Sequence, residues 1–132
     1  SGLSDFFKWH GHLSHNVAIE LMAKGHVLAF PSLKEGTPHV VLEALSMGMP
    51  VICHNAYGMG LVVNEDCGWK IPLRSPTVSI DGFARTIESI LRHQELIEEK
   101  SRGACERARA LTWTEKVNCI SKEYGKISNS DI

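Results

Sequence analysis

The sequence has no pair of cysteines at the Cys-x-x-Cys spacing that zinc sites and dithiol redox centres use. Its four cysteines are spread widely along the 132 residues, at Cys53, Cys67, Cys105 and Cys119. We expect all four to be reduced thiols, and those in apolar or helical surroundings to pack as small hydrophobic side chains.

The sequence also has no excess of charge of either sign and no long apolar run. Fourteen Lys and Arg are balanced by fifteen Asp and Glu, which gives no basic footprint for nucleic acid or for an anionic membrane surface. Its apolar runs are much shorter than the roughly 20 residues of a membrane-spanning helix, and no signal peptide is recognisable. The cytoplasm is therefore the expected compartment.

Three histidines near the start, His10, His12 and His15, lack an acidic or cysteine partner beside them. Zinc and other transition-metal sites usually combine such ligands, and Gly11 between the first two favours a loop. No metal site is predicted.

Short apolar runs alternate with amphipathic stretches as far as residue 72. The run Val27–Phe30 is continuously apolar, which is typical of a parallel strand with helices on both faces. The pattern predicts strands near 6–10, 27–30, 50–53 and 68–71. It predicts helices near 14–25 and 38–47, and a helical turn at 61–63.

From residue 79 to residue 127 the period becomes helical, with the last helix beginning near Trp113. Strands that alternate with helices, followed by a helical close, predict an α/β fold: a Rossmann-like open parallel sheet with helices on both faces. We interpret residues 1–132 as a single, partial nucleotide-sugar-binding domain, with strand and helix alternation over 6–72 and a helical part over 79–127.

The densest chemical signal runs from Glu35 to Leu45, directly after a predicted strand and into a predicted helix. In open parallel sheets the ligand crevice lies at the carboxyl ends of the strands, where a helix N-terminus favours phosphate. Gly36 allows close approach of a ligand to the backbone. Pro38 has no N–H, so the expected donors to a diphosphate are the amides of Thr37, His39 and Val40.

Two carboxylates flank this anion site. Glu35 precedes the helix, and Glu43 lies on the same helix face as His39 by the four-residue spacing. A carboxylate repels phosphate but accepts hydrogen bonds from neutral hydroxyl groups. Because a sugar ring and a ribose both offer hydroxyls, the pattern indicates a nucleotide sugar rather than a bare nucleotide.

The segment Glu35–Glu43, with Pro31-Ser32 before it and Gly48-Met49-Pro50-Val51-Ile52 after it, resembles the E-x7-E signature of retaining glycosyltransferases of GT-B fold, "group 1" (family 4-like). The resemblance implies that Glu35 is the catalytic residue and contacts hydroxyls of the transferred sugar, and that Glu43 binds the ribose. It places the backbone of 36–40 near the sugar and phosphates, and Gly11 and His12 beside the base.

The resemblance also implies an enzyme that uses a UDP- or GDP-sugar donor without a further cofactor, in polysaccharide biosynthesis, in the cytoplasm and peripheral to the inner membrane. The family places an Arg and a Lys on the diphosphate, but Lys8, Lys24 and Lys34 do not match those positions. We therefore interpret the chain as lacking the N-terminal domain that holds the acceptor, and expect it to be inactive alone. An exposed sheet edge and self-association are the structural hypotheses that follow.

Alternatives remain open at this level. A non-catalytic α/β module that binds a nucleotide or another protein fits the same fold. Two carboxylates beside a sugar also fit a hydrolase, although a glycosidase has no anion to hold. His39 could carry protons, but a positioning role is favoured, and Glu43 could be an ordinary exposed helix residue.

Overall fold

The computed structural model describes residues 5–36 and 38–128. Thr37, one of the predicted amide donors, lies outside the described residues, as do residues 1–4 and 129–132. The described elements follow one another along the chain as α1 His15–Met22, β1 Leu28–Phe30, α2 His39–Ser46, β2 Val51–His54, α3 Tyr57–Val62, β3 Gly68–Ile71, α4 Pro76–Arg92, α5 Glu95–Ala110 and α6 Trp113–Ser128.

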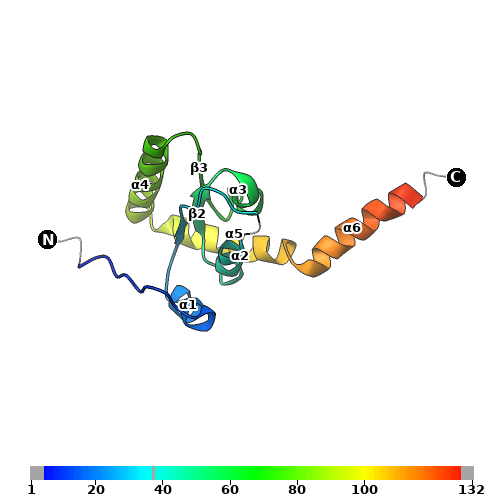
Figure 1. Ribbon diagram of the computed structural model, residues 1–132, viewed down its shortest axis with the longest axis horizontal. Coiled ribbons are helices and arrows are strands. Elements are labelled where there is room, and N and C mark those ends of the chain that lie inside the picture. Colours follow the sequence, from blue (N-terminus) through cyan, green and yellow to red (C-terminus); the bar gives the residue numbers. More distant parts are fainter. Residues whose placement is uncertain (1–4, 37, 129–132) are drawn as a thin grey trace.

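The three strands form one parallel sheet in the order β1-β2-β3 (Figure 1). Leu28 pairs with Val51 in the first ladder, and Val51 pairs with Gly68 in the second. Strand β2 lies in the centre and is buried along its whole length. The sequence prediction of a parallel α/β sheet is confirmed.

Alternate residues of β2 face two different cores, as strand geometry requires. Val51 and Cys53 belong to the larger core, which packs against α2, α3 and α5. Ile52 belongs to a smaller core, which it forms with Ile71 of β3 and Ile90 of α4. Helices therefore cover both faces, with α4 alone on one side of the strands in Figure 1.

The predicted helix from residue 38 to residue 47 is confirmed as α2. It ends where Gly48 adopts a φ of +71°, a left-handed conformation that glycine takes at no steric cost. A side chain at Gly48 would also crowd the Cys105 sulfur on α5, 3.0 Å from the position of a Cβ. The glycine thus ends the helix and lets α5 approach it.

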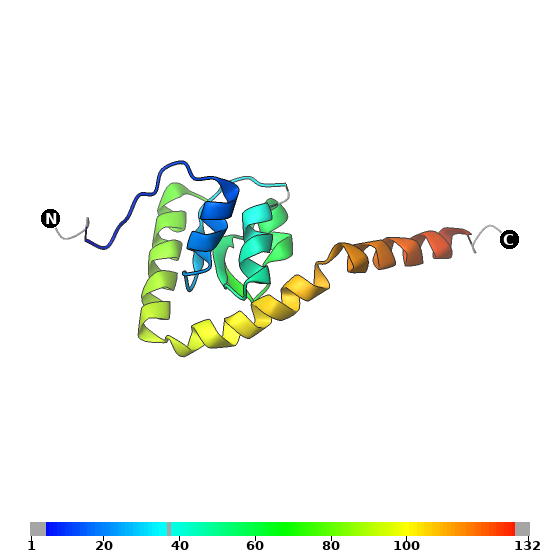
Figure 2. The ribbon, with the colours of Figure 1, turned by 90° about the horizontal axis from the view of Figure 1, so that it is seen from below.

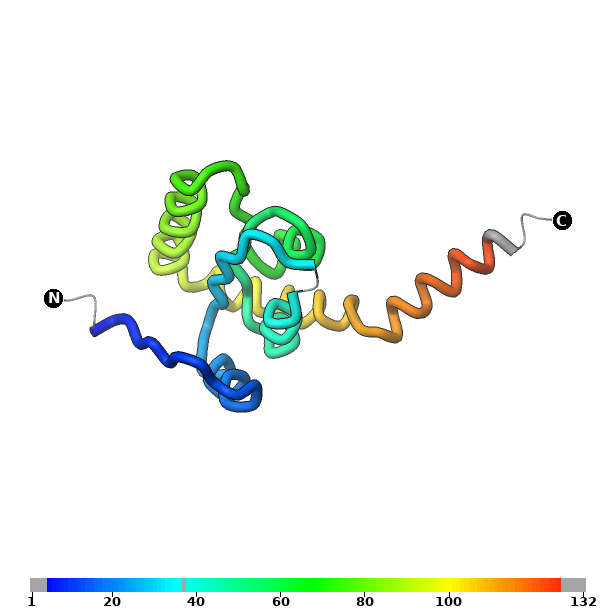
Figure 3. The backbone as a smooth tube through the Cα atoms, viewed as in Figure 1, coloured from blue at the N-terminus to red at the C-terminus, as the bar shows by residue number. Residues whose placement is uncertain are grey.

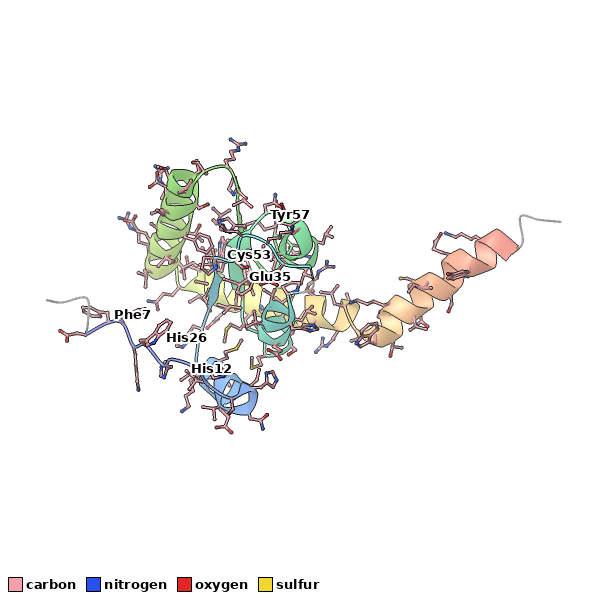
Figure 4. The ribbon with its side chains drawn as sticks, viewed as in Figure 1. Phe7, His12, His26, Glu35, Cys53 and Tyr57 are labelled. Carbon is pink, nitrogen blue, oxygen red and sulfur yellow. The ribbon has the colours of Figure 1, made fainter. Side chains whose placement is uncertain are left out.

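The strand predicted at 6–10 is wrong. Residues 5–14 form no strand, and the side chains of Phe6 and Trp9 are 91% and 81% exposed. Figure 4 shows Phe7 well away from the sheet. Aromatic residues favour a strand only where a paired and half-buried surface receives them, and the described strands pair only with one another.

Three predicted boundaries also differ. Helix α1 ends at Met22, three residues before Gly25, because the amides of Lys24 and Gly25 donate to carbonyls three residues back, at Leu21 and Met22, and not four residues back as in an α-helix. Helix α3 begins at Tyr57 rather than near residue 61. Helix α4 begins at Pro76 rather than at 79, because Ser75 caps it by accepting from the amide of Val78.

The last helix, α6, extends away from the rest of the molecule, on the side opposite to the segment that precedes α1 (Figures 2 and 3). It covers the predicted helix from Trp113. Its apolar stripe is exposed at Trp113, Val117, Ile120 and Tyr124. Within residues 5–36 and 38–128, no helix has the length and apolar character to cross a membrane.

Candidate functional site

Three strand-to-helix loops meet at one edge of the sheet, because parallel strands all end on the same side. Strand β1 leads into the loop before α2, β2 into α3, and β3 into α4. Backbone bonds join these loops: Gly58 N–H donates to the Glu35 carbonyl at 3.0 Å, and Asn55 N–H donates to the Ile71 carbonyl at 2.8 Å. This edge is where an open α/β sheet binds its ligand.

Glu35 is held in the loop between β1 and α2. The Ser32 hydroxyl donates to its Oε1 at 3.2 Å, and the side chain is half-buried. The start of α3 packs closely on this loop, since a Cβ on Gly58 would lie 2.1 Å from the Gly36 carbonyl oxygen. Only glycine fits at position 58, and the loop conformation therefore depends on α3.

Glu43 lies one turn inside α2 and faces α1. The His15 Nε2 atom lies 3.3 Å from its Oε1, and the Glu43 side chain is 32% exposed. The sequence indicated a carboxylate on the helix but not this partner, because the periodicity of a helix does not say which residue of another helix comes beside it. Glu35 and Glu43 each have their own partner, Ser32 and His15.

The other residues that the sequence predicts to contact the nucleotide sugar lie around the start of α2. Gly36 is exposed, with open space where a side chain would stand. His39 and Val40 are the first two residues of the helix, whose amides lack acceptors within it. The His39 side chain lines a hollow of about 220 Å³ that Trp113 also borders. The Val40 side chain packs against the larger core, so the group that Val40 can offer to a ligand is its backbone N–H.

The predicted base contacts, Gly11 and His12, lie in the exposed segment before α1, and Gly11 has a φ of +66°. Figure 4 places His12 beside α1, on the side of the molecule away from α3. Among the described residues, no group of three or more His, Cys, Asp or Glu side chains is placed so that it could hold a metal ion.

Tyr57 is a candidate site residue that sequence reasoning did not select. It begins α3 with a φ of +51°, a conformation that non-glycine residues rarely adopt. Its ring is exposed, and the Lys34 ammonium lies 5.9 Å from the ring centroid. Figure 4 shows Tyr57 and Glu35 in the same group of side chains around α3. Strained residues of this kind gather at functional sites.

His54 is the second residue that the sequence did not single out. It ends β2, is 1% exposed, and bonds through both ring nitrogens, to the Ser32 carbonyl at 3.0 Å and to the Ser79 hydroxyl at 2.9 Å. The available signal was its position directly after an apolar strand, at the edge where parallel sheets bind ligands.

A cavity of about 670 Å³ opens beside His54. Its walls come from the loop after β1, the loop after β3 and the first turns of α4, and are mostly apolar, with Leu33, Leu73, Ile80 and Phe83 among them. Ligand cavities in proteins have this size and this balance of a few polar groups among apolar ones.

Buried thiols lie on the opposite side of the central strand from His54's cavity. Burial is the main cause that raises the pKa of Cys53 to about 11, and the neighbouring Cys67, which would have to share the region with a second thiolate, adds to it. Burial also raises the pKa of Cys67. Neither is a thiolate near neutral pH, so neither is suited to nucleophilic chemistry.

Comparison with known proteins identifies the family. The model of the family described as glycosyl transferases group 1 matches residues 1–109. This chain belongs to that family. The match ends within α5, and α6 lies beyond it.

Two curated relatives of this group 1 chain are glycosyl transferases by name. The chain is 26% identical over 113 residues to sulfoquinovosyl transferase of Arabidopsis thaliana and covers 22% of its length. It is 26% identical over 105 residues to α-D-kanosaminyltransferase of Streptomyces kanamyceticus and covers 26% of its length. These matches take in 86% and 78% of this chain. The chain spans about a quarter of the relatives it matches.

Solved structures share the fold of this group 1 chain. Sucrose-phosphate synthase from Thermosynechococcus elongatus superposes with a TM-score of 0.74 at 23% identity, over 98% of this chain and 32% of that one. The pneumococcal O-GlcNAc transferase, solved with UDP and GlcNAc, gives a TM-score of 0.70 at 18% identity, over 94% and 25%. At these identities the likeness concerns the fold alone.

Proposed function

We propose that the protein that carries this chain transfers a sugar from a UDP- or GDP-sugar to an acceptor, with retention of configuration, and that this chain binds the donor. The observation that carries the proposal is the position of the Glu35 and Glu43 pair. The two residues bracket the loop and first turn of α2, at the ligand-binding edge of a sheet, in a member of the group 1 family.

The chemistry of this position supports the assignment. The first amides of α2 and the dipole of that helix favour the binding of a diphosphate. Gly36, which has no side chain, leaves open space in front of the helix N-terminus. Glu35, with one oxygen already accepting from Ser32, retains lone pairs for sugar hydroxyls. Glu43, whose partner among the described residues is the exposed His15, can accept from ribose hydroxyls once that histidine turns away.

We propose that catalysis rests on positioning and on stabilising the departing diphosphate, with Glu35 as the residue that contacts the reacting sugar. The names of the two curated relatives, both sugar transferases, and the UDP in the pneumococcal structure support a nucleotide-sugar donor. We place the reaction in polysaccharide biosynthesis, in the cytoplasm at the periphery of the inner membrane, as the sequence led us to expect.

Calorimetry on the native protein tests the role of Glu43. Replacing Glu43 with Ala should weaken binding of the sugar nucleotide by roughly 1.5 to 3 kcal/mol, the range for hydrogen bonds to a charged group. Glu106→Ala, at an exposed position of α5, is the matched control and should bind like the wild type. An unchanged dissociation constant for Glu43→Ala would remove this residue from the site.

The competing hypothesis is a non-catalytic module that binds a plain nucleotide. Comparing UDP and GDP with UDP-glucose, UDP-GlcNAc and GDP-mannose separates the two. A donor site binds one sugar conjugate more tightly than its parent nucleotide, whereas the module binds the two alike. Transfer of the sugar, measured with the same panel, then identifies the donor.

A further inference from the structure

His54 is a buried polar side chain that the proposed function leaves unexplained. It closes the central strand β2 and is 1% exposed. Its ring meets that of Phe83 edge-on, with the centroids 5.3 Å apart and an interplanar angle of 71°. A polar ring in such surroundings is costly to bury unless both of its nitrogens are hydrogen-bonded.

Both nitrogens are bonded, and the partners fix the tautomer. Nδ1 lies 3.0 Å from the Ser32 carbonyl oxygen, which can only accept, so Nδ1 carries the proton. When the ring is neutral, Nε2 accepts from the Ser79 hydroxyl, 2.9 Å away on α4. The ring is thereby fixed between the sheet, α4 and the loop that follows β1.

Ser32 continues this chain of bonds towards the candidate site. Its carbonyl accepts from His54, while its hydroxyl donates to Glu35 Oε1 at 3.2 Å. The Glu35 carbonyl in turn accepts from the amide of Gly58. His54, at the end of β2, and Gly58, in α3, therefore hold the same loop at two points, Ser32 and Glu35.

We propose that His54 is a positioning residue for Glu35. By fixing the Ser32 backbone, it directs the Ser32 hydroxyl to the Glu35 carboxylate and holds that carboxylate ready to accept hydrogen bonds from the sugar of the donor. This inference rests on the proposed function of Glu35. Holding a binding group in place before the ligand arrives avoids the cost of ordering it during binding.

A purely structural role for His54 leads to different expectations. A histidine that only fastens α4 to the sheet lowers stability when it is replaced, and weakens every ligand of this edge to the same degree. A positioning residue acts through Glu35. Its replacement should therefore lower the affinity that the sugar part of the donor contributes and leave the affinity for the nucleotide part unchanged.

Two substitutions separate the bonds of His54. In His54→Asn the amide nitrogen takes the place of Nδ1 and can still donate to Ser32. In His54→Gln the amide reaches towards Ser79 and leaves the Ser32 carbonyl without its donor. In the native protein we expect His54→Gln to weaken the preferred sugar nucleotide by about threefold to tenfold with UDP or GDP binding unchanged, and His54→Asn to bind near wild-type levels.

A double-mutant cycle with Glu35→Gln tests whether the effect passes through Glu35. The two losses should not add, because the carboxylate that His54 positions is already absent. Ser75→Ala is the control: it removes the N-cap of α4 without touching the bonds of His54 and should leave the sugar contribution intact. Equal weakening of UDP and its sugar conjugate by His54→Gln, or full addition in the cycle, overturns the proposal.

Failure of the proposed function has a separate signature, in which the wild-type protein binds no sugar conjugate more tightly than its nucleotide. The bond network is then tested without ligand, by the 13C chemical shift of the Glu35 carboxyl carbon at fixed pH. Ser32→Ala and His54→Gln should shift that resonance in the same direction, and His54→Asn should not. An unchanged resonance in His54→Gln contradicts the positioning role.

Discussion

Individual side chains change character with burial, and the cysteines show this most directly. Cys53 and Cys67 lie in the larger core, whereas Cys105 is half-buried and Cys119 is exposed on α6. The sequence prediction of free thiols is confirmed for all four. A buried thiol with a raised pKa reacts slowly for two reasons: reagents cannot reach it, and little of it is in the reactive thiolate form.

We therefore predict that iodoacetamide at pH 8 modifies Cys119 in the native protein before it modifies Cys53 or Cys67. Peptide mass spectrometry over time measures this order, and all four should react alike in denaturant. The folded state holds the Cys53 proton more tightly than the unfolded state does, so this thiol's contribution to stability is complete at neutral pH. It is lost as pH rises towards about 11. Modification of Cys53 at the rate of Cys119 at pH 8 would contradict its burial.

At the scale of elements, α4 connects the site to the second face of the sheet. It supplies Ser79 to His54 and packs Ile90 and Phe83 against the smaller core. Gly82 permits this packing, because a Cβ there would lie 2.3 Å from the Cγ2 atom of Ile71. The start of the helix is set by Ser75, which satisfies an amide that has no acceptor within the helix.

Replacing Ser75 with Ala should lower the free energy of unfolding by about 1 kcal/mol, the usual cost of losing an N-cap side chain. Urea unfolding followed by circular dichroism measures the change. Ser89→Ala, at an exposed position late in the same helix, is the control and should unfold like the wild type. Equal stability of Ser75→Ala and wild type would show that the cap contributes nothing.

At the scale of the whole molecule, the sheet ends in an open edge. Strand β1 pairs with β2 on one side, and within residues 5–36 and 38–128 no other strand pairs with it. A cavity of about 490 Å³ adjoins this edge, with Val27, Ala29, Ile87 and Leu91 among its walls. Unpaired edges with apolar neighbours are sites of association between chains.

The 132-residue chain should therefore self-associate, and static light scattering should show a mass that rises with concentration. Ala29→Lys places a charge on the exposed side of β1 and should return the chain to a monomer, since edge lysines oppose strand pairing. A wild-type chain that stays monomeric at every concentration contradicts self-association. Association that survives Ala29→Lys points instead to another exposed surface, such as the apolar stripe of α6.

Periodicity and helix-ending residues by themselves determined the alternation of elements from 27 to 72, the α/β class, and the place of Glu35 at a strand-to-helix loop. These are local or nearest-neighbour properties: a continuous apolar run specifies a buried parallel strand, and Gly48 ends a helix wherever the helix lies. The roles assigned to Glu35, Gly36, His39, Val40 and Glu43 remain predictions.

Only the tertiary structure decided which groups meet across the chain. It rejected the strand at residues 6–10, because pairing requires a neighbour that no local pattern supplies. It joined Ser32 to His54 across 22 positions and His54 to Ser79 across 25. Such bonds depend on which strand ends at which edge and on which face a helix returns to. Those relations arise only when the helices pack on the sheet, so they cannot be predicted from local sequence patterns.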